Sequence, residues 1–267
     1  MGQCVTGSPV DLLARFACVL VLLPPSEGKA TGSDGPALDL SALSFSALTR
    51  TRTKVVKALV RAAKKDRPAL QKALQLSDKQ VAELDKDAQL LTAPTLPASE
   101  LYTGIVYDNL SYATLPAAAR RRADESLAVA SALFGLLRPT DRVPSYRLSG
   151  QTVLPGLGGL AAVWRPPLEK ELRAHAFVVD LRSGAYAKLA RVPGAVEVRV
   201  LRDADGTRTV VSHDNKWTKG QLARELCLHG AATVGEVAEI ARTVCDAVEV
   251  DGHRVDLLLH GLASARA

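Results

Sequence analysis

The feature of this sequence that most constrains its fold is a run of five apolar residues, Val19–Leu23, with no polar residue among them. A continuous run of valine and leucine is typical of a strand that is buried on both faces, as in parallel and mixed sheets. The run is far too short to span a membrane, and it leads directly into Pro24 and Pro25. We therefore expect a buried strand over 19–23, followed by a turn that carries polar residues.

Helical patterns occupy much of the remaining chain. We expect helices over 53–65, from 77 toward 91, over 117–137, over 164–175, from 218 to 230 and from 233 to about 246. The starts of three of them have the residue spacing of a capping box, in which a Ser or Thr side chain and a Glu or Gln side chain satisfy the first helix amides. These pairs are Ser77 with Gln80, Thr218 with Gln221, and Thr233 with Glu236.

Strand patterns are interspersed with these helices. A strand is expected over 176–181, and the segments 196–200 and 207–212 are expected to form a hairpin through Asp205-Gly206, because Asp-Gly suits a tight type I′ turn. A second hairpin is expected around Asp251-Gly252. The alternation predicts an α/β or α+β protein, with a single mixed β-sheet core that is flanked by helices and carries a helical hairpin lobe.

Length and composition favour one large globular unit. The chain has 267 residues, of which 47% are apolar and 23% are charged, as in ordinary soluble proteins. We expect a single domain over 19–267, in which the segment 50–92, bounded by prolines, forms a helical lobe. Residues 1–18 are interpreted as an extension or a misassigned start, and they show no targeting signal.

The cysteines and histidines do not suggest a metal or a redox site. Four cysteines are widely spaced, without a C-x-x-C pair, and five histidines are scattered along the chain. Neither a zinc site nor a disulfide framework is indicated, so we expect no metal, no cofactor and a cytoplasmic location. The net charge of +6 is compatible with an anionic partner.

The predicted helix over 53–65 carries a concentration of positive charge. Between Arg50 and Arg67 there are eight basic residues and a single acid, Asp66. At 100° per residue, five of the basic side chains fall within an arc of about 100°, with valine, leucine and alanine opposite. These five are Lys54, Lys57, Arg61, Lys64 and Lys65. Such a face can neutralise the phosphates of duplex DNA without reading its sequence, or it can simply be solvated.

A second group of polar residues lies in three separate loops. Ser26, Glu27 and Lys29 follow the first strand, where α/β proteins often place ligands. Arg138, Tyr146 and Arg147 are set among prolines, and arginine offers a planar donor fork for phosphate. Lys216 and Lys219 flank Thr218, whose predicted position at a helix start favours an anion. Together these loops would form a pocket for a nucleotide or a nucleic-acid end, but each also has a purely structural explanation.

Several blocks of the chain together resemble the YaaA peroxide-stress protein family. The segment from Gly135 to Leu148, GLLRPTDRVPSYRL, is similar to the most recognisable block of that family. Further similar blocks, in the same order as in the family, are the strand 19–23 with Pro24–Lys29, Tyr102-Thr103-Gly104, Val178–Leu181 with Ser183 and Tyr186, and Lys216–Gly220. The resemblance implies that these loops meet in one pocket, to which Tyr102, Ser183 and Tyr186 would then also contribute.

The same resemblance implies a function. Members of the family are associated with the response to hydrogen peroxide, with limiting iron-dependent oxidative damage, and with binding double-stranded DNA through a helix-hairpin-helix element. The segment 50–92 resembles that element, although it lacks the usual Gly-x-Gly turn between Arg67 and Ser77. We therefore expect a stress protein that binds duplex DNA largely without sequence specificity.

The pocket suggests an alternative from a different class of function. An enzyme could hydrolyse an N-glycosidic or phosphate bond of a nucleotide or nucleoside-like molecule there, with Glu27 as general acid or base and Asp180 as the next candidate. Many relatives carry acidic residues between the serine and the tyrosine of the Ser183–Tyr186 block, where this chain has Gly184 and Ala185. Carboxylate chemistry is therefore not expected at those two positions.

Overall fold

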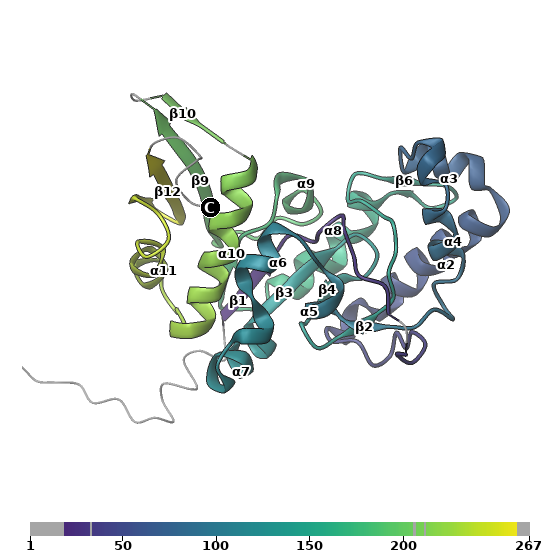
Figure 1. Cartoon of the computed structure of the whole chain (residues 1–267), viewed down its shortest axis with the longest axis horizontal. Coiled ribbons are helices and arrows are strands. Elements are labelled where there is room, and N and C mark those ends of the chain that lie inside the picture. Colours follow the sequence, from purple (N-terminus) through teal and green to yellow (C-terminus); the bar gives the residue numbers. More distant parts are fainter. Residues whose placement is uncertain (1–18, 33, 205–206, 211, 261–267) are drawn as a thin grey trace, which may run out of the picture.

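The computed structural model describes residues 19–32, 34–204, 207–210 and 212–260. Residues 1–18 and the turn Asp205-Gly206 lie outside these ranges, so the expected extension and the expected tight turn are not described. In the described part, the main sheet has eight strands, in the order β11-β12-β9-β8-β1-β3-β4, with β10 paired to β9. The fold is of the expected α/β class with a mixed sheet (Figure 1).

The centre of the sheet is parallel and its edges are antiparallel. The parallel strands are β3 (Leu127–Ser131), β1 (Val19–Leu23), β8 (Phe177–Asp180), β9 (Val196–Ala204) and β12 (Arg254–His260). The antiparallel strands are β4 (Gly135–Leu137), β10 (Thr207–Thr209) and β11 (Ala247–Asp251). Both expected hairpins are therefore confirmed. Two short pairs lie outside the main sheet, β2 (Leu96–Pro97) with β5 (Arg142–Val143), and β6 (Val153–Leu154) with β7 (Gly158–Gly159).

Strand β1 lies between two hydrophobic cores, as its continuous apolar run predicts. All five of its residues are buried. Because successive side chains of a strand point to opposite faces, Leu20 and Leu22 enter one core, whereas Val19, Val21 and Leu23 enter the other. The second core is completed by α6 (Ile105–Leu110), α7 (Ala117–Ser126), α10 (Ser212–His229) and α11 (Val234–Ala241).

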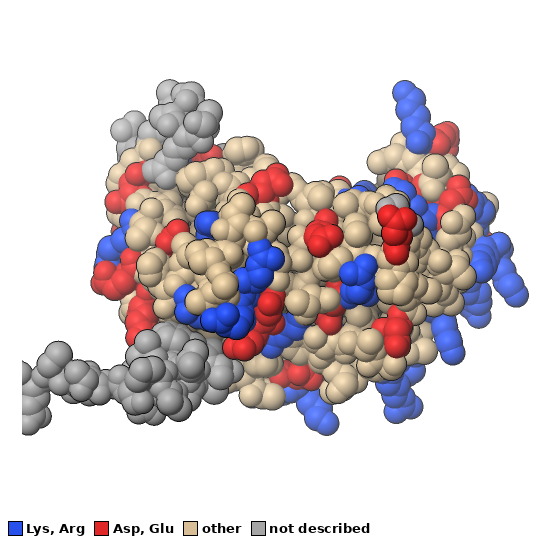
Figure 2. Space-filling view, turned by 60° about the horizontal axis from the view of Figure 1, so that its bottom comes forward, with Lys and Arg blue, Asp and Glu red and all other residues tan. Residues whose placement is uncertain are grey.

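The other core extends from the sheet into a helical lobe. The lobe contains α2 (Thr49–Lys65), α3 (Arg67–Ala73), a 3-10 turn over Asp78–Gln80 and α4 (Glu83–Ala88). These helices lie at the opposite end of the molecule from β9–β12 (Figure 1). Lys and Arg side chains project from this end of the surface (Figure 2). The buried side of α2 joins the core through Val55, Val56 and Leu59.

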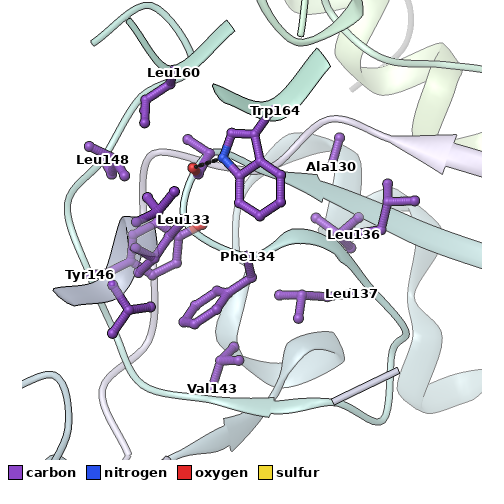
Figure 3. Close-up of a cluster of buried hydrophobic side chains, with 14 of the residues drawn as sticks. Ala130, Leu133, Phe134, Leu136, Leu137, Val143, Tyr146, Leu148, Leu160 and Trp164 are labelled. Carbon is purple, nitrogen blue, oxygen red and sulfur yellow. Dashed lines mark hydrogen bonds between the residues drawn. The ribbon is translucent and has the colours of Figure 1, made fainter. Parts of the chain in front are cut away.

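Trp164 anchors the packing between the sheet and α8 (Leu160–Leu172). Its side chain is fully buried, and its indole N–H donates a hydrogen bond of 2.8 Å to the carbonyl oxygen of Ala132, so that the polar end of the ring is satisfied (Figure 3). The Phe134 ring meets the Tyr146 ring edge-on, with centroids 5.5 Å apart, in the arrangement that aromatic pairs prefer. This core therefore fixes the loop that carries Tyr146.

The remaining helices are short, and they connect the lobe, the sheet and the cleft described below. They are α5 (Ala98–Leu101), α9 (Gly184–Ala187) and 3-10 turns over Ser46–Leu48 and Tyr112–Thr114. Among the described residues, no helix combines the length and apolar character that a membrane span requires.

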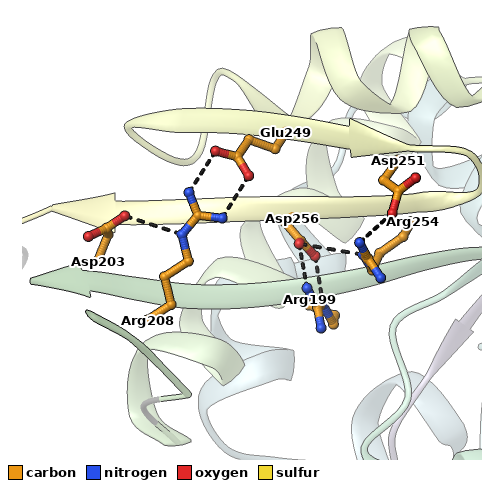
Figure 4. A network of polar contacts seen from close by, with 7 residues as sticks. All are labelled: Arg199, Asp203, Arg208, Glu249, Asp251, Arg254 and Asp256. Carbon is orange, nitrogen blue, oxygen red and sulfur yellow. Dashed lines mark hydrogen bonds and ion pairs between the residues drawn. The ribbon is translucent and has the colours of Figure 1, made fainter. Parts of the chain in front are cut away.

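Ion pairs tie the outer strands of the sheet together. The buried carboxylate of Asp256 on β12 accepts hydrogen bonds of 2.7 and 2.5 Å from Arg199 on β9 (Figure 4). On strand β10, Arg208 bridges Asp203 of β9 and Glu249 of β11, and both of its hydrogen bonds to Glu249 measure 2.7 Å. These contacts link β9, β10, β11 and β12.

Most of the expected helices differ from those observed at their ends, and three differ more substantially. The predicted helix over 117–137 is wrong beyond Ser126, because 127–131 and 135–137 form β3 and β4. Both strands are wholly buried, and a short apolar run gives no periodicity that separates strand from helix. Thr218 does not cap a helix, since α10 begins at Ser212 and Thr218 is buried within it. The segment from Ser77 forms a 3-10 turn and the short α4 instead of one helix.

Candidate functional site

A cleft of about 790 Å³ lies beyond the carboxyl ends of β1 and β8, the usual place for ligands in open α/β sheets. Its walls come from six stretches of chain. They are the turn after β1 (24–29), the end of α3 (73–75), the start of α6 (103–107), the loop 147–152, the segment after β8 (181–186) and part of α10 (215–219). The cleft thus lies between the sheet and the helical lobe.

Most of the pocket residues expected from the sequence do meet in this cleft. Those that line it are Ser26, Glu27, Lys29, Arg147, Ser183, Tyr186, Lys216 and Lys219. Tyr102 and Tyr146 are buried, and the ammonium of Lys29 lies over their rings. The parallel strands β1 and β8 bring together the two loops that follow them, and the loop 147–152 and α10 complete the cleft.

Arg138 is the exception and does not line the cleft. Its guanidinium donates a hydrogen bond of 3.0 Å to the carbonyl oxygen of Leu127, and it lies 4.6 Å from the centre of the Phe45 ring. Its backbone amide donates to the carboxylate of Asp141 at 2.8 Å. Arg138 therefore stabilises the turn after β4, and the expected cationic wall is reduced to Arg147.

The turn after β1 is held by contacts with the segment before α6. The hydroxyl oxygen of Ser26 accepts a hydrogen bond of 3.1 Å from the Thr103 amide. Lys29 forms a β-bridge with Tyr102, and the Ala30 amide donates to Leu101 at 2.9 Å. The Tyr107 hydroxyl donates to the carbonyl oxygen of Pro24 at 2.7 Å. The backbone around Lys29 is therefore fixed on both sides.

The ammonium of Lys29 lies at the base of the cleft in a confined environment. Its Nζ is 2.9 Å from the carbonyl oxygen of Ser26 and 4.4 Å from the centre of the Tyr146 ring. Burial, followed by the positive charge of Arg147, lowers the pKa of Lys29 to about 8. A larger fraction of this amine is therefore neutral near pH 7 than of an exposed lysine.

Next to Lys29, three hydroxyl groups form a buried chain of hydrogen bonds. The hydroxyls of Tyr102 and Tyr146 are 2.9 Å apart, and that of Tyr146 is 2.7 Å from the Ser131 hydroxyl. Ser131 also accepts from the Phe134 amide at 3.0 Å. Burial raises the pKa of both tyrosines, so that both remain neutral at physiological pH.

Asp87 brings a carboxyl group from the lobe to the same region. Its Oδ1 accepts a hydrogen bond of 2.9 Å from the Arg147 amide, whereas its Oδ2 is buried and has no hydrogen-bond partner in the part of the chain that the structure describes. Burial raises the pKa of Asp87 to about 7, although the Arg147 amide and the charge of Lys29 oppose the shift. A buried carboxyl and a buried amine therefore both titrate close to neutral pH here.

Glu27, the proposed general acid or base, lies at the rim of the cleft. Its side chain is 85% exposed, and one carboxylate oxygen is 3.5 Å from the Arg147 guanidinium. Exposure keeps such a carboxylate well solvated, so it can steer or bind a cationic group at the entrance.

On the opposite wall, one turn of α10 presents polar groups to the cleft. Lys219 is buried, and its Nζ donates to the carbonyl oxygen of Arg182 at 3.3 Å. Burial lowers the pKa of Lys219 to about 8, opposed by the charges of Asp180 and Glu197. Lys216 is exposed, and the Oδ1 of Asn215 is a buried acceptor without a hydrogen-bond partner among the described residues.

Asp180, the second carboxylate candidate, has a structural partner. Arg182 binds it through two nitrogens, with N···O distances of 2.9 and 2.7 Å, and also donates to Ala190 at 3.0 Å. Arg182 is buried, and a buried ion pair of this kind stabilises a structure only when it is complete. Asp180 therefore holds the segment after β8 in shape.

The basic face expected on residues 54–65 is present on α2. Lys54, Lys57, Arg61, Lys64 and Lys65 are all exposed, and none of them forms an ion pair within the described ranges. The guanidinium of Arg61 lies beside Gly156. Arg52, near the start of the same helix, points the other way: it is fully buried and donates bonds of 2.7 Å to the carbonyl oxygens of Phe134 and Leu136.

Three residues of the cleft region were not expected from the sequence. Asp87 looked like one more polar residue of a predicted helix, Arg182 carried no motif, and Asn215 was hidden by the misplaced helix start at Thr218. The one available signal was Arg182, whose place next to a strand-end aspartate permits a local ion pair. In the described ranges, no cluster of three or more His, Cys, Asp or Glu side chains could hold a metal ion.

Comparison with known proteins identifies the family of this chain. The sequence model of a family described as "Peroxide stress protein YaaA" matches residues 19–244. A UPF0246 protein of Streptomyces coelicolor is 44% identical over 259 residues, which cover 91% of this chain and 99% of that protein. A UPF0246 protein of Corynebacterium efficiens is 44% identical over 248 residues, 90% of this chain and 98% of its own length. This chain therefore belongs to the YaaA peroxide-stress family, whose curated members here carry the designation UPF0246.

Proposed function

We propose that this protein binds double-stranded DNA largely without sequence specificity, in the cytoplasm, and thereby helps to limit iron-dependent oxidative damage during peroxide stress. The observation that carries this proposal is the outer face of α2. The helix contains no acidic residue, and its exposed side presents the five basic side chains Lys54, Lys57, Arg61, Lys64 and Lys65. Lysine and arginine side chains along one surface neutralise phosphates and so bind duplexes of any sequence.

The side chains of α2, more than the backbone of the turn that follows α3, support this function. A helix-hairpin-helix element binds phosphate through free amides of its turn. Here the amides of Gln75 and Leu76 donate to Lys72 and Gln71, and the Ser77 amide donates to Gln80. Gln75 adopts a φ of 54°, where a glycine would be expected. We therefore assign the phosphate contacts to α2, with α3 and α4 as its support.

The direct experiment is a titration of the purified protein against a fluorescent duplex and the matching single strand at two salt concentrations. Micromolar or tighter duplex binding that weakens steeply with salt supports phosphate-led binding. Equal affinity for duplexes of unrelated sequence supports the lack of specificity. Absence of binding at low salt would remove DNA from the function and leave the basic face of α2 as a solvated surface.

A second function is favoured by a separate observation, the composition of the cleft. Arg147, Lys216, Lys219 and Lys29 line a cavity that also has an aromatic wall in Tyr186. We propose that this cavity binds a nucleotide or nucleoside-like molecule, with its phosphate on the cations and its base against the ring. If the protein hydrolyses such a molecule, Glu27→Gln should keep ligand affinity and lose turnover. Calorimetric titration with AMP tests the binding, and undetectable heat at millimolar AMP would exclude the nucleotide.

A further inference from the structure

Lys29 has the geometry of a nucleophilic amine. It lines the cleft, and its Nζ lies 2.9 Å from the carbonyl oxygen of Ser26 and 3.4 Å from that of Glu27. A neutral amine can donate its two hydrogens to these two acceptors and keep its lone pair for a third direction. The Tyr146 and Tyr102 rings lie on another side, 4.4 and 5.7 Å away. Lys29 is therefore oriented by four fixed neighbours.

The rest of the cleft offers binding groups for a phosphorylated, hydroxyl-rich molecule. Arg147 and Lys216 are cations at its walls, and Lys219 adds a third, buried nitrogen. Asn215 presents a buried Oδ1 with no hydrogen-bond partner among the described residues, an acceptor that a sugar hydroxyl would satisfy. These groups line the same cleft as Lys29, so together they indicate a ligand that spans the cleft.

From this arrangement we propose that Lys29 forms a covalent imine with the aldehyde of an open-chain sugar phosphate. The lone pair of Nζ attacks the carbonyl carbon, and proton transfer from nitrogen to oxygen gives a carbinolamine. Loss of its hydroxyl group as water, with one proton taken up, leaves a protonated C=N bond to Lys29. No oxidant or reductant is needed, and the reverse reaction with water releases the aldehyde.

The surroundings favour each state of this reaction. The lowered pKa of Lys29, about 8, leaves about one amine in ten neutral at pH 7, against fewer than one in a thousand for an ordinary lysine. The iminium product is a cation beside the face of the Tyr146 ring, which attracts positive charge.

The aldehyde could come from two sources: a free sugar phosphate, or the open-chain deoxyribose of an abasic site in DNA. Both present an aldehyde next to hydroxyl and phosphate groups. The inference rests on the cleft as a ligand site, the second function proposed above, and its DNA arm also rests on duplex binding. The experiment therefore uses both probes.

The test is reductive trapping with sodium cyanoborohydride of the full-length protein, mixed at pH 7 with deoxyribose 5-phosphate or with a duplex that contains one abasic site. Intact-protein mass spectrometry should detect one adduct, and peptide mapping should place it on Lys29. We expect labelling of Lys29 to exceed that of Lys170, an exposed lysine on α8, by about a hundredfold, because only Lys29 is held beside an aldehyde bound in the cleft. An adduct from the sugar phosphate alone identifies the free molecule, and one from the duplex alone identifies the abasic site.

Two variants serve as controls. Lys29→Arg keeps the positive charge and removes the nucleophile, so it should abolish the specific adduct, whereas Lys170→Gln should leave it unchanged. Mapping of the wild-type adduct decides the question even if Lys29→Arg fails to fold. Absence of any adduct, or an adduct on Lys219 or scattered over surface lysines, overturns the inference. AMP titration and binding of an undamaged duplex, measured on the same preparation, show separately whether the cleft and DNA functions hold.

Discussion

The Oδ1 of Asp87 accepts a hydrogen bond of 2.9 Å from the backbone amide of Arg147. The bond joins α4 of the helical lobe to the loop that forms one wall of the cleft. It satisfies only half of the carboxylate, because the Oδ2 of Asp87 is buried with no hydrogen-bond partner among the described residues. Ionisation of Asp87 therefore destabilises the folded protein. The lobe and the cleft wall are joined through a carboxyl group that changes its charge near neutral pH.

This coupling predicts a pH-dependent stability. The pKa of Asp87 is raised from 3.8 to about 7 in the folded protein, so the folded state holds a proton that the unfolded state has lost. Its contribution is fully present below pH 4 and is lost as the pH rises to 7, by about 1.4 kcal/mol per pH unit. Asp87→Asn keeps the oxygen that accepts from Arg147 and removes the titration.

We therefore expect the wild type to lose stability between pH 5 and pH 8, whereas Asp87→Asn does not. The free energy of unfolding of the variant minus that of the wild type should rise by about 3 kcal/mol over this range. Urea denaturation at the two pH values measures the change. Asp85→Asn, an exposed carboxylate on the same helix, is the control and should show little pH-dependent difference. A constant difference for Asp87→Asn would mean that Asp87 is ionised throughout this range.

Duplex binding should depend on the outer face of α2. Reversing Lys57 and Arg61 to Glu is expected to weaken binding about equally for all sequences and to reduce the slope of log affinity against log salt by about two. Fluorescence anisotropy measures both quantities. The control is Arg121→Glu with Lys170→Glu, an equal change in net charge at exposed positions on α7 and α8. Equal losses in the two double variants would mean that only overall charge matters.

The two sides of α2 should respond differently to substitution. Arg52→Ala removes both donors to Phe134 and Leu136, leaves their buried carbonyl oxygens unpaired and opens a cavity. We expect a loss of about 3 kcal/mol in the free energy of unfolding. Lys54→Ala, on the exposed side of the same helix, should change it by less than about 0.5 kcal/mol. Thermal and urea denaturation compare the two, and similar losses would contradict the buried role of Arg52.

The close approach of α10 and α6 depends on Gly220. A Cβ at this position would overlap the carbonyl oxygen of Val106 and lie 2.7 Å from the Cβ of Asn109. Because backbone cannot yield as a side chain can, Gly220→Ala should destabilise the protein by about 2 kcal/mol. Gly184→Ala has no neighbour within 4 Å and should be neutral. Melting temperatures of the two variants test the contrast, and a stable Gly220→Ala would mean that the helices move apart without cost.

Patterns that depend on neighbouring residues were predicted well from the sequence. The strand over 19–23, the amphipathic α2, the box of Thr233 with Glu236 and both C-terminal hairpins appear where they were expected. Each has a local cause: an apolar run, a helical period, a cap, or an Asp-Gly turn. The family resemblance added what local patterns do not contain, namely that the loops after β1 and β8 meet.

Features that depend on tertiary burial were not predictable. Leu127–Ser131 is apolar on both faces, so its periodicity could not separate a strand from the end of α7. Arg138 and Arg147 looked equivalent in the sequence, and only packing against Phe45 turns Arg138 away from the cleft. The raised pKa of Asp87 likewise results from its burial, which depends on the tertiary packing around it and not on the local sequence.

The position of β1 between two cores limits how the length of the protein can change. An inserted or deleted residue within Val19–Leu23 would exchange Leu20 and Leu22 with the side chains of the opposite face, in both cores at once. The six residues from Pro24 to Lys29 are also held in place, because Pro24 contacts Tyr107, Ser26 contacts Thr103 and Lys29 pairs with Tyr102. Relatives that differ in length should therefore have gained or lost residues elsewhere, with the spacing from the first strand to the cleft lysine unaltered.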